Sequence, residues 1–294
     1  RSTHPMAIII QPSDAPKVVY ELQPDLNREF GHRLLRTNSQ GLRESREYAT
    51  QRAPGSVRIV GIGDSGMFGW NLDQEQDYMT VLETNLNRRQ DGILYEVLNM
   101  GVPGYNTQLE VEQLRAKGLA YKPDIVIVGW CVNDFSLPFF LLQKENYRRL
   151  DKSFLYGLLF KRTKEFTELG QGITLHDLRD YAPDSVAPEI SKGADVEGVR
   201  AALAKLKRMG SEAGFKLLVF GPMDPIICGI CKELAVPYTN TYELSPPGKY
   251  PKEYLVHFMH PSAAGHNALA LELEADLRRR GWLPADRPPV TEKP

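Results

Sequence analysis

Residues 57–69 read VRIVGIGDSGMFG, in which a stretch rich in β-branched residues leads directly into a glycine-rich turn. The β-branched residues at 57–62 predict a strand. Residues 77–89 then place the apolar side chains of Tyr78, Val81, Leu82 and Leu86 at helical spacing. A strand, a loop and a helix in this order predict the first βα unit of a parallel sheet.

The same alternation continues along the chain. It predicts further strands at 95–99, 124–129, 216–220 and 236–240, and helices at 108–117, 196–213, 225–234 and from Ser262 to about Arg280. The strand at 124–129 is apolar throughout, as strands buried on both faces of a parallel sheet are. The fold class is therefore α/β, a three-layer α/β/α domain with a flavodoxin-like parallel sheet of about five strands.

Three segments do not follow this alternation. Residues 1–55 are rich in proline and polar residues, and we expect an extension that packs on the main domain (56–284) through Val18, Val19, Tyr20 and Leu22. Residues 135–195 interleave aromatic, aliphatic and basic residues, which predicts a helical insertion. Its part at 135–160 is either core or a lid that covers an acyl group or contacts a membrane surface. Residues 285–294 are expected to form a tail.

Composition excludes several classes of protein. The 294 residues carry 36 Lys and Arg against 37 Asp and Glu, so a general nucleic-acid binder, which needs a basic excess, is disfavoured. Three cysteines cannot form a disulfide scaffold. Apolar runs such as 125–132 are far shorter than the ~18 residues of a membrane span. The first residues, RSTHPM, suggest a truncated N-terminus without a complete signal peptide, so both a cytoplasmic and an exported location are consistent with the sequence.

Residues suited to acyl-transfer chemistry follow the predicted strands. Ligands of open parallel sheets bind beyond the carboxyl ends of the strands. Acyl transfer needs a hydroxyl nucleophile, an imidazole that takes its proton, and donors aimed at the developing oxyanion. Ser65 is the candidate nucleophile and His260 the candidate base. The backbone N–H groups of Ser65 and Gly101, with the side-chain amide of Asn133, are the candidate oxyanion hole.

At these residues the chain resembles the SGNH (GDSL) hydrolase family. The four blocks that carry the resemblance are GDSGMFG at 63–69, NMGVPG at 99–104, GWCVND at 129–134 and HFMHP at 257–261, in the family's order. The resemblance extends over about residues 56–280. It implies a serine hydrolase that cleaves carboxylic esters through an acyl-enzyme without a cofactor. It also implies Ser65, Gly101, Asn133 and His260 in the roles given above, with a small-molecule, glycan or lipid ester as substrate.

One block departs from the family pattern. Where the family has an aspartate three residues before the catalytic histidine, this chain has His257. A neutral His257 can orient His260 but supplies no negative charge for the imidazolium. Three interpretations remain: His260 leans on a backbone carbonyl, another carboxylate such as Asp224 reaches it, or the site is impaired. The alternatives to an esterase are therefore a glycan O-acyltransferase or deacetylase, and a catalytically weak binding protein.

The GDSG block, the clustered histidines and the two neighbouring cysteines also have simpler interpretations. The GDSG block also occurs in chymotrypsin-like proteases, but their all-β fold contradicts the α/β pattern. A metal site at His257, His260 and His266 is disfavoured, since the segment lacks the HExxH spacing. For Cys228 and Cys231 a packing role is favoured over a redox pair.

Overall fold

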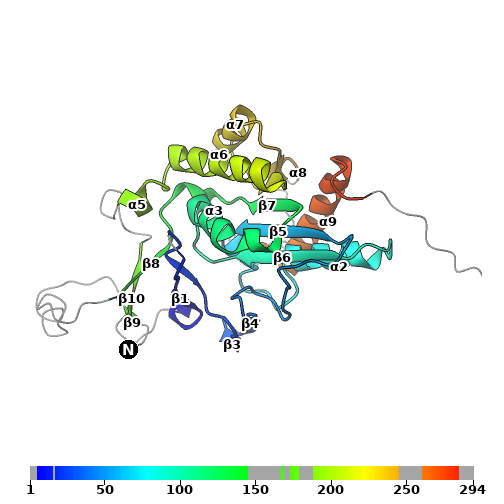
Figure 1. Cartoon of the computed structure of the whole chain (residues 1–294). Helices are drawn as coiled ribbons and strands as arrows, with labels where there is room; N and C mark the ends of the chain where they lie inside the picture. The colour runs from blue at the N-terminus through cyan, green and yellow to red at the C-terminus, as the bar shows by residue number, and fades with distance from the viewer. Residues whose placement is uncertain are drawn as a thin grey trace, which may run out of the picture.

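The centre of the molecule is a five-stranded parallel sheet (Figure 1). The computed structural model describes residues 5–15, 17–144, 167–168, 173–178, 188–244 and 260–284. Neighbouring strands are parallel throughout this sheet, which confirms the predicted strand number and direction. In order across the sheet the strands are β12 (Tyr238–Asn240), β11 (Lys216–Gly221), β7 (Ile125–Gly129), β5 (Val57–Gly63) and β6 (Tyr95–Gly101).

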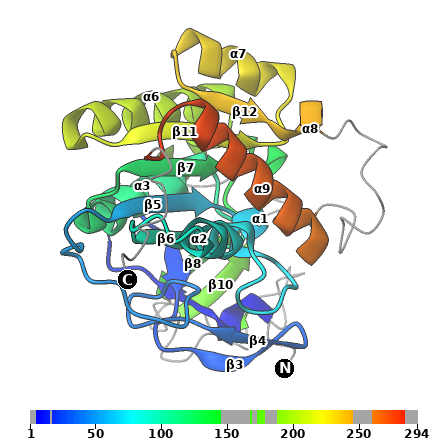
Figure 2. The same cartoon turned by 90° about the vertical axis from the view of Figure 1, so that its right-hand side faces the viewer.

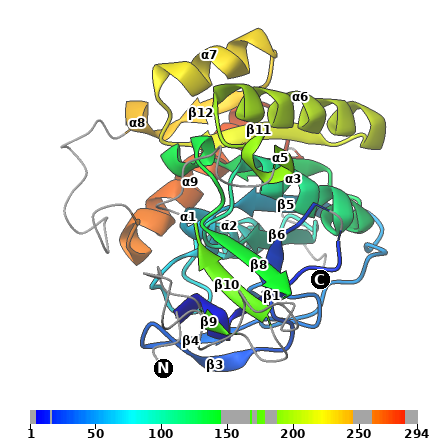
Figure 3. The same ribbon diagram turned by 90° about the vertical axis from the view of Figure 1, so that its left-hand side faces the viewer.

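Helices cover both faces of the sheet and complete the predicted three layers. Figure 2 shows α2 (Tyr78–Arg88) and α9 (Ala263–Arg279) on one side, where Leu82 and Leu273 share a buried cluster with the strands. The opposite side, seen in Figure 3, carries α3 (Thr107–Ala116), α6 (Val196–Ala213) and α7 (Pro225–Glu233). Short turns are η1 (Pro5–Ile8), α1 (Ser65–Phe68), η2 (Gly118–Tyr121), η3 (Val132–Phe135), α5 (Pro188–Ser191) and α8 (Thr241–Leu244).

The strand order creates a switch point between β5 and β7. After β5 the chain moves outward to β6, and it then returns past β5 to form β7. The connections that leave β5 and β7 therefore diverge to opposite faces of the sheet. Ligands of doubly wound sheets bind in the crevice at such a point. Here it is occupied by the turn α1, which follows β5, and by η3, which follows β7.

Residues of the N-terminal extension form two antiparallel hairpins. β1 (Ile10–Pro12) pairs with β2 (Tyr20–Leu22), and β3 (Asn27–Phe30) pairs with β4 (Arg33–Arg36). The side chains of Val18, Tyr20 and Leu22 are buried in a cluster shared with the main domain, while Val19 is partly buried. The Tyr20 hydroxyl donates to the Pro103 carbonyl at 3.0 Å, so the extension contacts the loop that follows β6.

The prediction of a helical insertion is wrong for most of its described residues. β8 (Phe140–Lys144), β10 (Ile173–Asp177) and β9 (Thr167–Glu168) form a small antiparallel sheet. A consecutive apolar run such as 139–142 does not distinguish strand from helix by its period, and the distant partner β10 decides for strand. Residues 145–166 lie outside the described ranges, so a lid or membrane contact at 135–160 stays a prediction. Among the helices of the described ranges, none combines the length and apolarity of a membrane span.

Candidate active site

Ser65 and His260 lie within hydrogen-bond distance of each other. Ser65 is the first residue of α1, directly after β5, and His260 precedes α9, whose N-cap is Ser262. The Nε2 atom of His260 is 2.9 Å from the Oγ atom of Ser65, although 195 residues separate them. Both side chains are half-buried. This is the geometry that a nucleophile and its general base require.

Asp64 ties the nucleophile turn together. Its Oδ1 atom accepts the Gly66 N–H at 2.8 Å and so caps α1. The carboxyl group is fully buried, and this burial raises its pKa, while hydrogen bonds from Gly66, Asn133 and Ser65 act in the opposite direction. Asp64 therefore links the nucleophile turn to the Asn133 amide, in addition to its capping role.

Two of the predicted oxyanion donors have hydrogen-bond partners within the structure. The Asn133 Nδ2 atom donates to the Tyr105 carbonyl at 3.4 Å, which places this amide beside the loop after β6. The Gly101 N–H donates to Asn99 Oδ1 at 2.9 Å and is therefore already engaged. Gly104, in the same loop, has a φ of +80°, and its N–H has no hydrogen bond to any described residue. Gly104 was not among the predicted donors, although it belongs to the block NMGVPG.

The His260 imidazole is bordered by Trp70, which in turn contacts a second aromatic ring. The Trp70 ring stacks beside the His260 ring with centroids 6.0 Å apart and a 26° angle between planes. Phe30, from the extension, meets Trp70 edge-on at 5.3 Å. Neither residue was predicted. Trp70 follows the GDSGMFG block directly, so its place beside the nucleophile could have been inferred, whereas nothing local marks Phe30.

The sequence was compared with known proteins. Residues 62–268 match the model of the GDSL-like lipase/acylhydrolase family. The chain belongs to this family. The resemblance to SGNH (GDSL) hydrolases is thereby confirmed. Membership of this family supports the broad assignment of the protein as a hydrolase. No curated protein was found to match the sequence of this GDSL-like protein.

Several solved structures are similar to this GDSL-like protein. TesA is 16% identical, with a TM-score of 0.48 and coverage of 76% of this chain and 98% of its own. A mutant of Axe2, an acetyl-xylooligosaccharide esterase from Geobacillus stearmophilus, is 17% identical, with a TM-score of 0.48 and coverage of 79% and 98%. The psychrotrophic esterase EstA from Pseudoalteromonas sp. is 15% identical, with a TM-score of 0.48 and coverage of 77% and 99%.

The identity of the residue that orients His260 in this GDSL-like protein stays a prediction. His257 lies outside the described residues. Asp224 follows β11 and serves as the N-cap of α7, where its Oδ1 atom accepts the N–H groups of Ile226 at 2.8 Å and Ile227 at 3.1 Å. This capping role explains the aspartate at this position without a catalytic function.

The other histidine of the closing segment is structural. His266 is buried, and its Nδ1 atom accepts the Tyr78 N–H at 3.0 Å. Burial lowers the pKa of His266 to about 3, and the nearby charges of Arg43 and His260 act in the same direction. His266 is therefore neutral near pH 7. Within the described ranges, no group of three or more His, Cys, Asp or Glu side chains is placed to hold a metal ion.

Two carboxyl groups are buried behind Asn133. Asp134 accepts the Cys131 N–H at 2.9 Å, and Glu110 of α3 lies against it. Burial raises the pKa of both groups well above the usual range; the charge of Asp134 adds to this for Glu110, and that of Asp64 for Asp134. A proton shared by Glu110 and Asp134 follows from this arrangement, since two adjacent buried charges repel each other. The Cys131 side chain is half-buried, and burial raises the pKa of its thiol, which favours a packing role over a reactive thiolate.

Proposed function

We propose that this protein hydrolyses carboxylic esters through an acyl-enzyme formed on Ser65. The observation that carries the proposal is the 2.9 Å separation of Ser65 Oγ and His260 Nε2. His260 takes the hydroxyl proton while Oγ attacks the ester carbonyl, and it then gives that proton to the departing alcohol. A water molecule repeats the sequence, with His260 again as base, and releases the acid. Serine and histidine are regenerated, so no cofactor is needed.

The developing oxyanion needs hydrogen-bond donors beside the nucleophile. We assign the Asn133 amide and the Ser65 N–H to this role, with the Gly104 N–H as the third donor in place of Gly101. The bond from Asn133 to Tyr105 is long at 3.4 Å, so a substrate oxygen can replace it at little cost. A hole built from fixed donors stabilises the transition state more than the ground state.

The substrate class follows from what borders the imidazole. Trp70, with Phe30 packed edge-on against it, provides an aromatic surface beside His260, against which an apolar acyl chain or the face of a sugar ring packs. We therefore propose a small-molecule, glycan or lipid ester. Hydrolysis of p-nitrophenyl esters of graded chain length measures the acyl preference, and added sugar alcohols reveal any transfer that competes with water.

The decisive experiment compares the unchanged protein with Ser65→Ala. We expect hydrolysis of a short p-nitrophenyl ester and labelling by a fluorophosphonate probe in the unchanged protein, and the loss of both in Ser65→Ala. Ser211→Ala, a change at an exposed serine on α6, is the matched control and should behave like the unchanged protein. A properly folded protein that neither hydrolyses esters nor reacts with the probe would support the binding-protein alternative instead.

A further inference from the structure

A buried arginine from the N-terminal extension binds the nucleophile turn. The Arg43 side chain donates from Nη1 to the carbonyls of Phe68 and Gly69, the latter at 2.8 Å, and from Nη2 to the Leu72 carbonyl at 2.7 Å. Its guanidinium carbon lies 4.7 Å from the centroid of the Phe68 ring. Only 3% of the residue is exposed, so these contacts are made away from water. A single side chain thus binds three backbone carbonyls of the segment that follows Ser65.

The turn α1 needs hydrogen-bond donors from other parts of the chain, because it is too short to pair its own carbonyl groups. The last carbonyls of any helix have no intrahelical donor, and α1 has only four residues. Gly69 and Trp70 donate their N–H groups to the Gly66 and Ser65 carbonyls. The Met67 carbonyl instead accepts from Asn99 Nδ2 at 2.8 Å, and the Phe68 carbonyl accepts from Arg43. Two side chains therefore complete the end of the helical turn that begins with the nucleophile.

The backbone at Gly69 leaves space for the Arg43 guanidinium. Gly69 ends α1 with a φ of +79°, a conformation that favours glycine. A Cβ atom at Gly69 would lie 2.6 Å from Arg43 Nη1, so a larger residue would displace the guanidinium. Burial lowers the pKa of the Arg43 guanidinium, and the nearby acidic side chains of Asp77, Glu44 and Asp73 act in the opposite direction. A planar guanidinium with several donors suits three carbonyls in a way that an ammonium group does not.

We propose that Arg43 is a positioning residue for catalysis, which fixes the turn α1 so that Ser65 Oγ stays in reach of His260 and of the oxyanion donors. This inference rests on the proposed function of Ser65. Arg43 touches no reacting atom and lies outside the segment 62–268 that matches the family model. It makes the N-terminal extension a part of the active site's framework. A shift of about 1 Å in a reacting group typically costs on the order of 10²-fold in rate.

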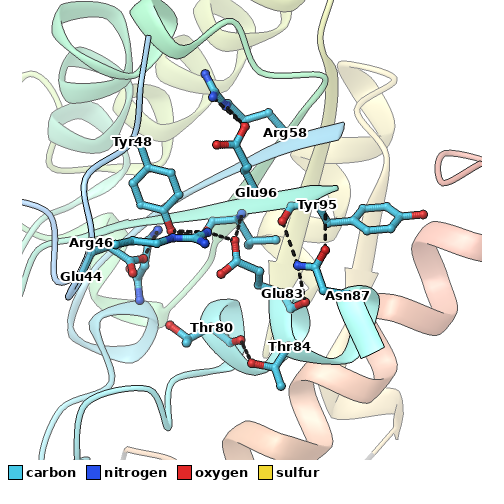
Figure 4. Close-up of polar contacts among 12 residues, drawn as sticks. Glu44, Arg46, Tyr48, Arg58, Thr80, Glu83, Thr84, Asn87, Tyr95 and Glu96 are labelled. Atoms are coloured by element: carbon cyan, nitrogen blue, oxygen red, sulfur yellow. Dashed lines mark hydrogen bonds and ion pairs between the residues drawn. The ribbon is translucent and has the colours of Figure 1, made fainter. Parts of the chain in front are cut away.

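The chain offers a matched control in a second buried arginine. Arg58 is completely buried at the beginning of β5, whereas the turn α1 follows the end of the same strand. Its Nη2 atom donates to Glu96 at 2.6 Å (Figure 4), and its Nη1 atom donates to the Tyr121 carbonyl at 2.7 Å. Replacement of either arginine removes a buried cation and leaves acceptors unpaired, so both replacements destabilise the fold. Only Arg43 contacts the nucleophile turn.

The test compares Arg43→Met, Arg43→Lys and Arg58→Met in the full chain. We measure the free energy of unfolding, kcat and KM separately, and the rate of fluorophosphonate labelling at Ser65, all at a temperature where each variant is folded. We expect Arg43→Met to lower kcat and the labelling rate about 10²-fold with KM changed less than about threefold. Arg58→Met should keep kcat within about threefold of the unchanged protein. Arg43→Lys should recover part of the loss, since it reaches fewer carbonyls at once.

Each outcome separates the two proposals. Equal kcat values for the Arg43 and Arg58 variants would overturn the positioning role, as would a loss that appears only in KM. If Arg43→Met does not fold, Arg43→Lys decides, because a folded lysine variant with full kcat contradicts the proposal. Absence of hydrolysis and labelling in the unchanged protein and in Arg58→Met would instead contradict the proposed function itself.

Discussion

Polar and charged side chains are buried at both ends of strand β5, but their hydrogen bonding differs between the two ends. At its amino end, Arg58 is paired with Glu96 (Figure 4). Arg58 also donates to the Tyr121 carbonyl, and its backbone N–H donates to Asp124 at 2.8 Å. Asp124 is also paired with Arg52. Charges and hydrogen bonds match here, as is usual for a buried polar network that stabilises a fold.

At the carboxyl end of β5 two buried polar atoms have no hydrogen-bond partner among the described residues. They are Arg43 Nε and His266 Nε2. The pKa of Glu110 is raised and that of His266 lowered, by burial in both cases. Unsatisfied buried groups and perturbed pKa values concentrate at functional sites. We infer that the amino end serves stability, whereas the carboxyl end gives up stability to hold reactive groups in place.

The largest effect expected from this difference is the loss of catalysis in Asn133→Ala. Removal of one oxyanion donor typically lowers kcat by about 10²–10³-fold. We expect that loss in ester hydrolysis, together with about 1–3 kcal/mol of stability, because the buried Asp64 carboxyl also loses its hydrogen bond from Asn133. Steady-state kinetics and chemical denaturation measure the two effects. A variant with full kcat would remove Asn133 from the oxyanion hole.

Asn87→Ala provides the matched control at the other end of the sheet. Asn87 Nδ2 donates to the Tyr95 carbonyl at 2.9 Å, and Asn87 Oδ1 accepts the Tyr95 N–H at 3.0 Å, at the beginning of β6 (Figure 4). Loss of these bonds leaves buried backbone groups unpaired, which costs about 1–3 kcal/mol of stability. We expect kcat to remain unchanged. A catalytic loss as large as that of Asn133→Ala would contradict the inference that the amino end of the sheet serves stability alone.

A smaller effect in the opposite direction is expected for His257→Asp. In a trypsin-type triad, neutralising the aspartate costs about 10⁴ in rate, because the imidazolium loses its stabilising charge. Restoring a carboxylate at the family's position should therefore raise ester turnover, by at least roughly tenfold if no other group has taken over the role. The measurement is kcat against pH for both proteins. An equal or lower rate in the variant would mean that His260 is oriented from elsewhere.

Much of the fold could be predicted because its signals are local. The strand at 57–62, the helix at 196–213 and the cap at Ser262 each depend on neighbouring residues, and the structure places them with errors of no more than one residue. The strand β8 could not be predicted in this way. Its apolar run has no diagnostic period, and its partner β10 lies about thirty residues further along the chain.

The site shows the same limit. The motifs identified Ser65, Asn133 and His260, since each follows the end of a predicted strand or precedes the closing helix. They did not show that the Gly101 N–H is engaged by Asn99, because that bond depends on a side-chain rotamer. They also gave no sign of Arg43. Its three carbonyl partners lie 25 to 29 residues away, and only the folded turn α1 brings them to one guanidinium.

The remaining expected effect concerns stability and not catalysis, and it is a change in the pH dependence of stability at His266. The folded protein keeps this imidazole neutral down to about pH 3, whereas the unfolded chain protonates it below about 6.5. The stabilising contribution is therefore complete above pH 6.5 and is lost as the pH falls toward 3, at roughly 1.4 kcal/mol for each pH unit. His266→Asn removes the titrating group, so denaturation between pH 7 and pH 4 should show a shallower decline than in the unchanged protein. His32→Asn, at a fully exposed histidine of the first hairpins, is the control and should leave the slope as it was. If both variants decline as steeply as the unchanged protein, the acid sensitivity comes from other groups, and the carboxyl end of β5 is less costly to stability than its unpaired atoms indicate.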